Sequence, residues 1–195
     1  MQSSGSIQKK AVFLDRDGVI NEESNYAYRL DQLALIPHAA DAIRLLNDHQ
    51  FLVVVITNQA GIARGYFPES RIPEVHARLD ELLAPHGAAI DRYEYCPHHP
   101  VEGIGSYKID CNCRKPKPGM LTSAATELNI DLTRSLMIGD RLGDIEAGAA
   151  AGCQSALVRT GYGASVTIAG DTTPPRFLGV FSTVGEAVEA WLNNR

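Results

Sequence analysis

The sequence has no long apolar run and no excess of positive charge. Its 195 residues carry 18 lysines and arginines against 23 aspartates and glutamates, which gives a formal net charge of −5. No segment approaches the ~20 apolar residues that a membrane-spanning helix needs. The basic footprint of a nucleic-acid-binding protein is also missing. Both absences exclude a membrane or a nucleic acid as the expected partner and favour a small molecule.

Cysteines and aromatic residues are few. The chain has 4 cysteines, and aromatic residues make up 7% of it. The polar start, Met1 to Lys10, lacks the apolar core of a signal peptide, so we expect a loose tail over residues 1–9 and a cytoplasmic location with reduced thiols. Hydrophobic residues make up 45%, enough for one well-buried domain over residues 1–195. Nothing in the sequence demands more than a monomer.

Apolar runs alternate with segments of helical periodicity. Expected strands lie at 11–14, 52–56, 92–95, 135–138, 154–159 and near Val180, and expected helices at 37–49, 68–84, 118–128, 144–151 and 184–193. This alternation predicts an α/β fold, a Rossmann-like three-layer sandwich with a mostly parallel sheet. No segment is long enough to form a large cap domain. We therefore expect an open site, flanked by the loop at 21–36.

Reactive side chains follow the ends of several expected strands. Asp15 and Asp17 follow the first strand, Thr57 ends the second, Asp140 follows the fourth, and Lys115 precedes a crossover helix. Right-handed crossovers bring such positions to one edge of a parallel sheet, where ligands bind. The two aspartates alone would also fit an ordinary Asp-rich turn. The agreement of four separate segments favours a functional site.

This set of side chains suits phosphoryl transfer. Carboxylates at strand ends favour a hard divalent cation such as Mg²⁺, with Mn²⁺ or Co²⁺ as alternatives. A hydroxyl and a lysine suit the phosphoryl oxygens. Asp15 can attack phosphorus to form an aspartyl phosphate. Asp17 can then protonate the leaving alcohol and later accept a proton from water.

The same segments resemble the motifs of the haloacid dehalogenase (HAD) superfamily. Asp15-Arg16-Asp17-Gly18-Val19 matches the first motif, Thr57 the second, Lys115 the third, and Gly139-Asp140 with Asp144 the fourth. The resemblance implies Asp15 as nucleophile, Asp17 as general acid and base, and Thr57 and Lys115 as phosphoryl stabilisers. It also implies Mg²⁺ bound by Asp15, the Asp17 carbonyl and Asp140. Asp144 stays open between the metal's surroundings and an N-cap of the next helix.

Three of the four cysteines lie in the stretch 96–115. Cys96, His98, Cys111 and Cys113 make a closed tetrahedral set for a structural Zn²⁺. A disulfide is the main alternative, although it would leave one thiol over, and His99 is the alternative imidazole. Such a zinc-binding loop would brace the adjoining Lys115 rather than take part in chemistry.

The combined pattern resembles one HAD family, the D-glycero-D-manno-heptose-1,7-bisphosphate 7-phosphatases. Segments 57–65, 95–100 and 113–116 carry this resemblance, and the related histidinol-phosphate phosphatases have a shorter zinc loop. The resemblance implies removal of the 7-phosphate on the way to ADP-heptose for lipopolysaccharide. A non-catalytic phospho-sugar-binding protein is the alternative from another class, but a binder needs no nucleophile. The implied substrate contacts, which solvated loop residues would also explain, are Glu23, Ser24, Asn25, Tyr26, Asn58, Gln59, Ala60, Arg114 and Arg141.

Overall fold

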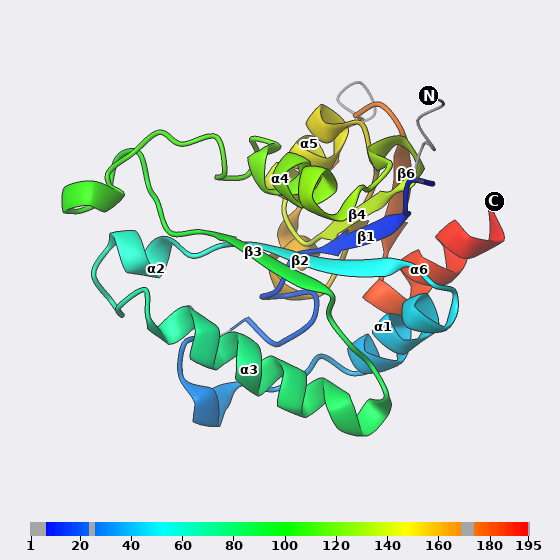
Figure 1. Cartoon of the computed structure of the whole chain (residues 1–195), viewed down its shortest axis with the longest axis horizontal. Helices are drawn as coiled ribbons and strands as arrows, with labels where there is room; N and C mark the ends of the chain where they lie inside the picture. The colour runs from blue at the N-terminus through cyan, green and yellow to red at the C-terminus, as the bar shows by residue number, and fades with distance from the viewer. Residues whose placement is uncertain (1–6, 24–25, 169–173, 195) are drawn as a thin grey trace, which may run out of the picture.

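A parallel sheet forms the centre of the computed structural model, which describes residues 7–23, 26–168 and 174–194. The strand order is β3-β2-β1-β4-β5-β6, and every neighbouring pair is parallel (Figure 1). This order confirms the predicted α/β sheet. The strands are β1 (Ala11–Leu14), β2 (Leu52–Asn58), β3 (Arg92–Cys96), β4 (Leu136–Gly139), β5 (Gln154–Val158) and β6 (Phe177–Phe181).

Helices cover both faces of the sheet, which confirms the three-layer sandwich. Helices α1, α3 and α6 pack on one face, and α4 and α5 pack on the other (Figure 1). The sequence did not predict the short helix α2, which directly follows β2. The helices are α1 (Ala39–Asp48), α2 (Ala60–Ala63), α3 (Arg71–Leu83), α4 (Gly119–Leu128), α5 (Leu142–Ala151) and α6 (Val184–Asn193).

The central strands are apolar throughout because both of their faces are covered. Val12 and Leu14 of β1 enter the core beneath α1 and α6, whereas Ala11 and Phe13 enter the core beneath α4. Successive side chains of a strand point to opposite faces, so an unbroken apolar run is needed. The unbroken run is what allows a strand to end abruptly in carboxylates.

Several element ends differ from the predictions by one to three residues, and three differences are notable. Residues 1–6 of the expected tail lie outside the described residues, but Lys9 is not loose: its N–H donates to Asn129 O at 2.9 Å, and it bridges Ile130. Helix α5 begins at Leu142, so the expected start at 144 was wrong, because the extended backbone of Arg141 already forms the N-cap. Pro118 likewise occupies the N-cap of α4 rather than its first turn.

The segments that overhang the carboxyl edge of the sheet are short. They are the loop after β1, which holds the 3₁₀ turn η1 (Leu30–Gln32), helix α2, and the stretch after β3 with η3 (Gly105–Tyr107). Within the described ranges they form no large cap domain, in agreement with the prediction. Among the residues that the structure describes, no helix has both the length and the apolar character required to cross a bilayer.

His76 of α3 lies in a buried aromatic environment. Its ring stacks on Tyr93 with centroids 4.1 Å apart and an interplanar angle of 14°. Burial and then the nearby Arg16 guanidinium lower the pKa of His76 from 6.5 to about 3. The folded protein therefore holds this imidazole neutral in the pH range in which the unfolded chain protonates it.

We expect acid to destabilise the protein through His76. Between pH 6.5 and 5.5 the unfolded chain takes up a proton that the folded state refuses, so the free energy of unfolding falls by about 1 kcal/mol from this group. In His76→Phe, which keeps an aromatic ring against Tyr93, this part of the pH dependence should disappear. Urea unfolding at the two pH values measures it. Equal pH dependence in both proteins would contradict the lowered pKa.

Candidate active site

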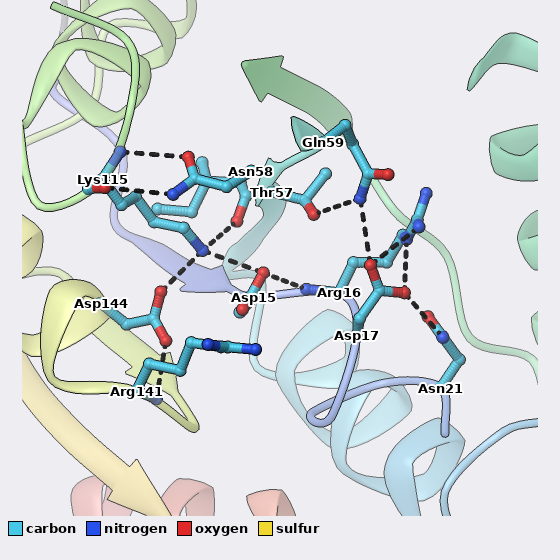
Figure 2. Close-up of polar contacts among 11 residues, drawn as sticks. Asp15, Arg16, Asp17, Asn21, Thr57, Asn58, Gln59, Lys115, Arg141 and Asp144 are labelled. Carbon is cyan, nitrogen blue, oxygen red and sulfur yellow. Dashed lines mark hydrogen bonds and ion pairs between the residues drawn. The ribbon is translucent and has the colours of Figure 1, made fainter. Parts of the chain in front are cut away.

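The ammonium group of Lys115 lies between two carboxylates at the carboxyl edge of the sheet (Figure 2). Its Nζ is 2.9 Å from Asp15 Oδ1 and 2.7 Å from Asp144 Oδ1, and it donates to the Ile56 carbonyl at 2.8 Å. Asp15 stands there because its own N–H continues the β-ladder to Ile138 O at 3.0 Å. The structure thus brings the strand ends of β1, β2 and β4 to one point, as the sequence predicted.

The end of β2 holds Lys115 in place. Asn58 accepts from the Lys115 N–H and donates to the Lys115 carbonyl, both at 3.1 Å. Asn58 lines the cavity described below, but its amide is engaged by the Lys115 backbone. The family resemblance implied that Asn58 contacts the substrate. The sequence did not predict that Asn58 holds the Lys115 backbone.

Three carboxyl groups, Asp15, Asp140 and Asp144, gather here, and Lys115 forms ion pairs with two of them, Asp15 and Asp144. Burial, with smaller contributions from the charges of Asp144 and Asp140, raises the pKa of Asp15 to about 8 despite Lys115. Burial also raises the pKa of Asp140, to about 6. Burial would lower the pKa of Lys115, but Asp144 and Asp15 outweigh it, so its pKa is raised and the lysine is charged. A cation bound here would offset the remaining repulsion.

The carboxylates fit a hard divalent cation. One oxygen from each of Asp15, Asp140 and Asp144 lies within 4.8 Å of the others. Asp140 is fully buried, and although its Oδ2 accepts from Tyr162 N at 2.8 Å, its Oδ1 has no hydrogen-bond partner. A buried carboxylate oxygen without a donor is costly unless a cation meets it.

Asp144 differs from the other two carboxylates. As the third residue of α5, it accepts from the Arg141 N–H at 2.9 Å through Oδ2, while Oδ1 meets Lys115. Both of its oxygens are therefore engaged by the protein. The N-cap alternative was wrong in position, because the cap is Arg141 and Asp144 binds the cap's backbone from within the helix.

Two glycines let neighbouring loops close onto Asp140. A Cβ at Gly18 or at Gly161 would each lie 2.3 Å from Asp140 Oδ2. Gly18 also has φ +85°, a left-handed conformation that side chains disfavour. These positions fix Asp140 tightly between the loop after β1 and the loop after β5.

Asp17 lies in a different environment from Asp15. Arg16 Nε donates to its Oδ1 at 3.0 Å and Arg16 Nη2 to its Oδ2 at 2.8 Å, with Asn21 Nδ2 on Oδ1 at 2.9 Å and Gln59 Nε2 on Oδ2 at 3.0 Å. Burial alone would raise the pKa of Asp17, but the Arg16 charge and these hydrogen bonds outweigh it, so the pKa is lowered. The sequence analysis missed Arg16 and Asn21. An arginine between two aspartates at the end of a buried strand was the available signal.

A cavity of ≈ 480 Å³ opens over these groups. Its wall includes Thr57, whose Oγ1 accepts from Gln59 Nε2 at 2.8 Å. The sequence missed three wall residues, Arg64, Gly143 and Tyr162, because their neighbourhood depends on tertiary packing. Ser24 and Asn25 lie outside the described residues. The remaining predicted substrate residues all line the cavity: Glu23, Tyr26, Asn58, Gln59, Ala60, Arg114 and Arg141.

Several wall arginines are held by other side chains. The Arg141 guanidinium lies 3.6 Å from the Tyr162 ring centroid. Arg64 forms an ion pair with Glu102 and lies over the Tyr26 ring. Arg114 donates to the His98 carbonyl at 3.2 Å. The cavity wall therefore carries positive charge beyond that of Lys115.

The cysteine stretch brings four candidate metal ligands together, three thiols and one imidazole. Cys111 Sγ is 3.4 Å from Cys96 Sγ and 3.1 Å from Cys113 Sγ, and His98 Nδ1 is 3.6 Å from Cys113 Sγ. Sulfur ligands around tetrahedral zinc are about 3.7 Å apart, given Zn–S distances of ~2.3 Å. All four cysteines of the chain are free, so the disulfide alternative is absent from the structure.

The neighbouring histidine has another role. His99 Nδ1 accepts from the N–H groups of Val101 and Glu102, at 3.3 and 2.9 Å. It therefore braces the turn that follows, whereas His98 faces the cysteines. The geometry favours His98 over His99 as the imidazole of the set.

We expect Gly139→Ala to disturb the carboxylate cluster. The added Cβ would lie 2.1 Å from Asp144 Cβ and 2.3 Å from its Oδ2. Overpacking of this kind costs about 1–3 kcal/mol of stability. Gly185→Ala is the matched control, because its Cβ meets nothing closer than 3.7 Å in α6. Chemical unfolding compares the two, and equal stability would refute the close packing of Asp144 on β4.

Comparison with known proteins identifies relatives over most of the chain. A family model described as HAD-hydrolase-like matches residues 112–187. The chain is 47% identical over 154 residues to the D-glycero-beta-D-manno-heptose-1,7-bisphosphate 7-phosphatase of Pasteurella multocida, covering 78% of this chain and 83% of the relative. It is 39% identical to the protein of that name from Yersinia pestis, covering 92% and 95%.

The fold comparison agrees. A crystal structure of D,D-heptose 1,7-bisphosphate phosphatase from B. bronchiseptica, complexed with magnesium and phosphate, matches with a TM-score of 0.84 and 34% identity. The match covers 95% of this chain and 99% of that one. The chain belongs to the D-glycero-D-manno-heptose-1,7-bisphosphate 7-phosphatase family of the HAD superfamily.

Proposed function

We propose that the chain is a Mg²⁺-dependent phosphatase that removes the 7-phosphate of D-glycero-D-manno-heptose 1,7-bisphosphate, on the route to ADP-heptose. The observation that carries this proposal is the Asp15 carboxylate held against Lys115 at the floor of a cavity. Relatives at 39–47% identity bear the name of this activity. A cytoplasmic location and a monomeric state stay predictions of the sequence.

Mg²⁺ would be held by Asp15, by Asp140 and by the Asp17 carbonyl. The oxygen of Asp140 that has no protein partner and the gathering of three carboxyl groups support this assignment. When bound, Mg²⁺ would neutralise charge between the nucleophile and the phosphate and stabilise the transition state. A magnesium ion accompanies phosphate in the related structure from B. bronchiseptica.

The protein residues would then act in two steps. Asp15 attacks phosphorus and forms an aspartyl phosphate, while Asp17 protonates the leaving C7 oxygen. Lys115 and the Thr57 hydroxyl donate to the phosphoryl oxygens, where charge develops. In the second step Asp17 accepts a proton from the water that hydrolyses the aspartyl phosphate.

The cavity wall supports a substrate with two phosphates. Arg64, Arg114 and Arg141 line it in addition to Lys115, and guanidinium groups are suited to phosphate oxygens. A second phosphate on the substrate would meet these guanidinium groups. Histidinol phosphate carries a single phosphate and an amine, so it is the poorer fit. A protein that only binds a phosphorylated sugar would not need a nucleophilic carboxylate held against Lys115.

The cysteine cluster would hold a structural Zn²⁺ through Cys96, His98, Cys111 and Cys113. Both ends of this stretch adjoin the site, because Arg114 follows Cys113 and donates to the His98 carbonyl. Zinc would therefore fix the position of Arg114 and of the Lys115 backbone, which is also hydrogen-bonded to the Asn58 amide. Its contribution is to folding and positioning rather than to chemistry.

Phosphate release separates the candidate substrates. With Mg²⁺, kcat/KM for the heptose 1,7-bisphosphate should exceed that for histidinol phosphate by ~10²-fold, about 2.7 kcal/mol of discrimination. Phosphate should leave from C7, and Asp15→Asn should abolish release from both compounds. A preference for histidinol phosphate would move the chain to the sister activity. Turnover by Asp15→Asn would refute the assigned nucleophile.

Metal analysis tests the zinc assignment. The purified protein should contain one zinc per chain, and Cys111→Ser should lose it along with thermal stability. Cys153→Ala is the matched control, because this buried cysteine lies outside the cluster and the zinc should remain. A strong chelator should lower the Tm of the unmodified protein but leave that of Cys111→Ser unchanged. A zinc-free protein of full stability would exclude the structural metal.

A further inference from the structure

We propose that Arg16 is a positioning residue for the reaction. Its guanidinium fixes the plane of the Asp17 carboxylate, so that only Oδ2 meets the leaving-group oxygen. When this happens, Oδ2 gives up its hydrogen bond from Gln59. This inference rests on the proposed function, because it concerns the residue that serves there as general acid and base. It assigns a task to a buried arginine that touches neither the phosphate nor the metal.

Arg16 grips Asp17 with two parallel hydrogen bonds, at 3.0 Å to Oδ1 and 2.8 Å to Oδ2 (Figure 2). The arginine is fully buried, whereas the Asp17 side chain keeps 14% of its exposure. A guanidinium paired in this way sets both the distance and the plane of a carboxylate. A lysine at this place would supply the charge without the plane.

Arg16 itself is held from several sides. Its Nη2 also donates to the Ala27 carbonyl at 3.1 Å, and its own carbonyl accepts from the N–H groups of Ile20 and Asn21 at 2.9 and 3.1 Å. Its N–H donates to Asp15 Oδ1 at 2.8 Å. One residue therefore ties the nucleophile and the acid into one rigid turn.

The two oxygens of Asp17 face different surroundings. Oδ1 accepts from Arg16 and from Asn21, two side chains that are fully buried. Oδ2 accepts from Arg16 and from Gln59, and Gln59 lines the cavity. The buried contacts shield Oδ1 from any ligand. Oδ2 is thus the oxygen that a substrate reaches.

Gln59 can release Asp17 at low cost. Its Nε2 also donates to the Thr57 hydroxyl at 2.8 Å, close to the 3.0 Å of its contact with Asp17. When a leaving-group oxygen takes its place on Oδ2, the amide keeps its bond to Thr57. The N–H that leaves Asp17 belongs to a residue that lines the cavity, where solvent or substrate oxygens can accept from it.

Leaving-group dependence distinguishes positioning from a structural role. A primary alkyl phosphate such as the heptose bisphosphate needs a proton on its leaving oxygen, whereas p-nitrophenyl phosphate needs little help. In Arg16→Lys, kcat/KM, which reports the step in which the alcohol leaves, should fall by ~10²-fold for the alkyl ester and by less than ~10-fold for the aryl ester. Parallel losses on both esters, with the fold intact by circular dichroism, would overturn the proposal.

A double-mutant cycle with Asp17→Asn gives an independent test. If Arg16 acts through Asp17, Arg16→Lys should cost less than ~3-fold on the alkyl ester once Asp17 is already asparagine. The full loss in that background would also overturn the proposal. If the unmodified protein hydrolyses neither ester, the proposed function fails instead, so the two failures are distinguishable.

Two further variants test the assignment of oxygens if Arg16 variants do not fold. Asn21→Ala removes a shielded contact to Oδ1, and its loss should be greater on the alkyl ester than on the aryl ester by ~10-fold or more. Gln59→Ala removes the exchangeable contact to Oδ2, and the two esters should change in parallel. The opposite pattern would make Oδ2 the held oxygen and refute the inference.

Discussion

The site depends on one electrostatic constraint: three buried carboxylates gather around a single lysine. Asp15, Asp140 and Asp144 lie with oxygens within 4.8 Å of one another, and Lys115 forms ion pairs with two of them, Asp15 and Asp144. A parallel sheet creates this constraint because the carboxyl ends of its strands meet at one edge. The surrounding structure serves to hold the lysine there and to leave room for a further cation. The Asn58 amide, the close packing of β4 on Asp144 and the glycines around Asp140 all serve this end.

Two aspartates only two residues apart are given opposite properties by their surroundings. Burial raises the pKa of Asp15, while Arg16 and the side-chain donors of Asn21 and Gln59 lower that of Asp17. The proposed roles need the opposite protonation states, a charged nucleophile at Asp15 and a proton on Asp17, so binding of the cation and of the phosphate must shift both pKa values. Arg16 contacts both groups, since its N–H faces Asp15 and its guanidinium faces Asp17.

The sequence predicted the sheet and the strand-end residues well because both depend on local pattern. The apolar run before Asp15 and the apolar run before Gly139-Asp140 were enough to predict that both aspartates lie at strand ends. Neither prediction needed to identify a residue that contacts them. Lys115 was predicted from its motif, but the reason for its position was not. Its support comes from Asn58, 57 residues away along the chain, and no local pattern encodes such a contact.

The residues that sequence reasoning missed share a physical character: each acts through a partner distant in the fold or through its burial. From the sequence, Arg16 would be taken for a solvent-exposed arginine in a turn. In the structure, the loop after β1 buries it. The start of α5 was misplaced for a related reason, because the acidic residue that suggested a cap binds the cap from inside the helix. Asp144 also meets Lys115, so one carboxylate begins a helix and fixes the central lysine.

The short segments around the cavity replace a cap domain. Without domain closure, binding energy must come from few contacts, so those contacts must be held in place beforehand. The structure does this with side-chain pairs, in which Arg141 lies on Tyr162 and Arg64 on Glu102. The cysteine cluster acts in the same way on Arg114 through the His98 carbonyl. A rigid wall of this kind allows an open site to select a small sugar that carries two phosphates.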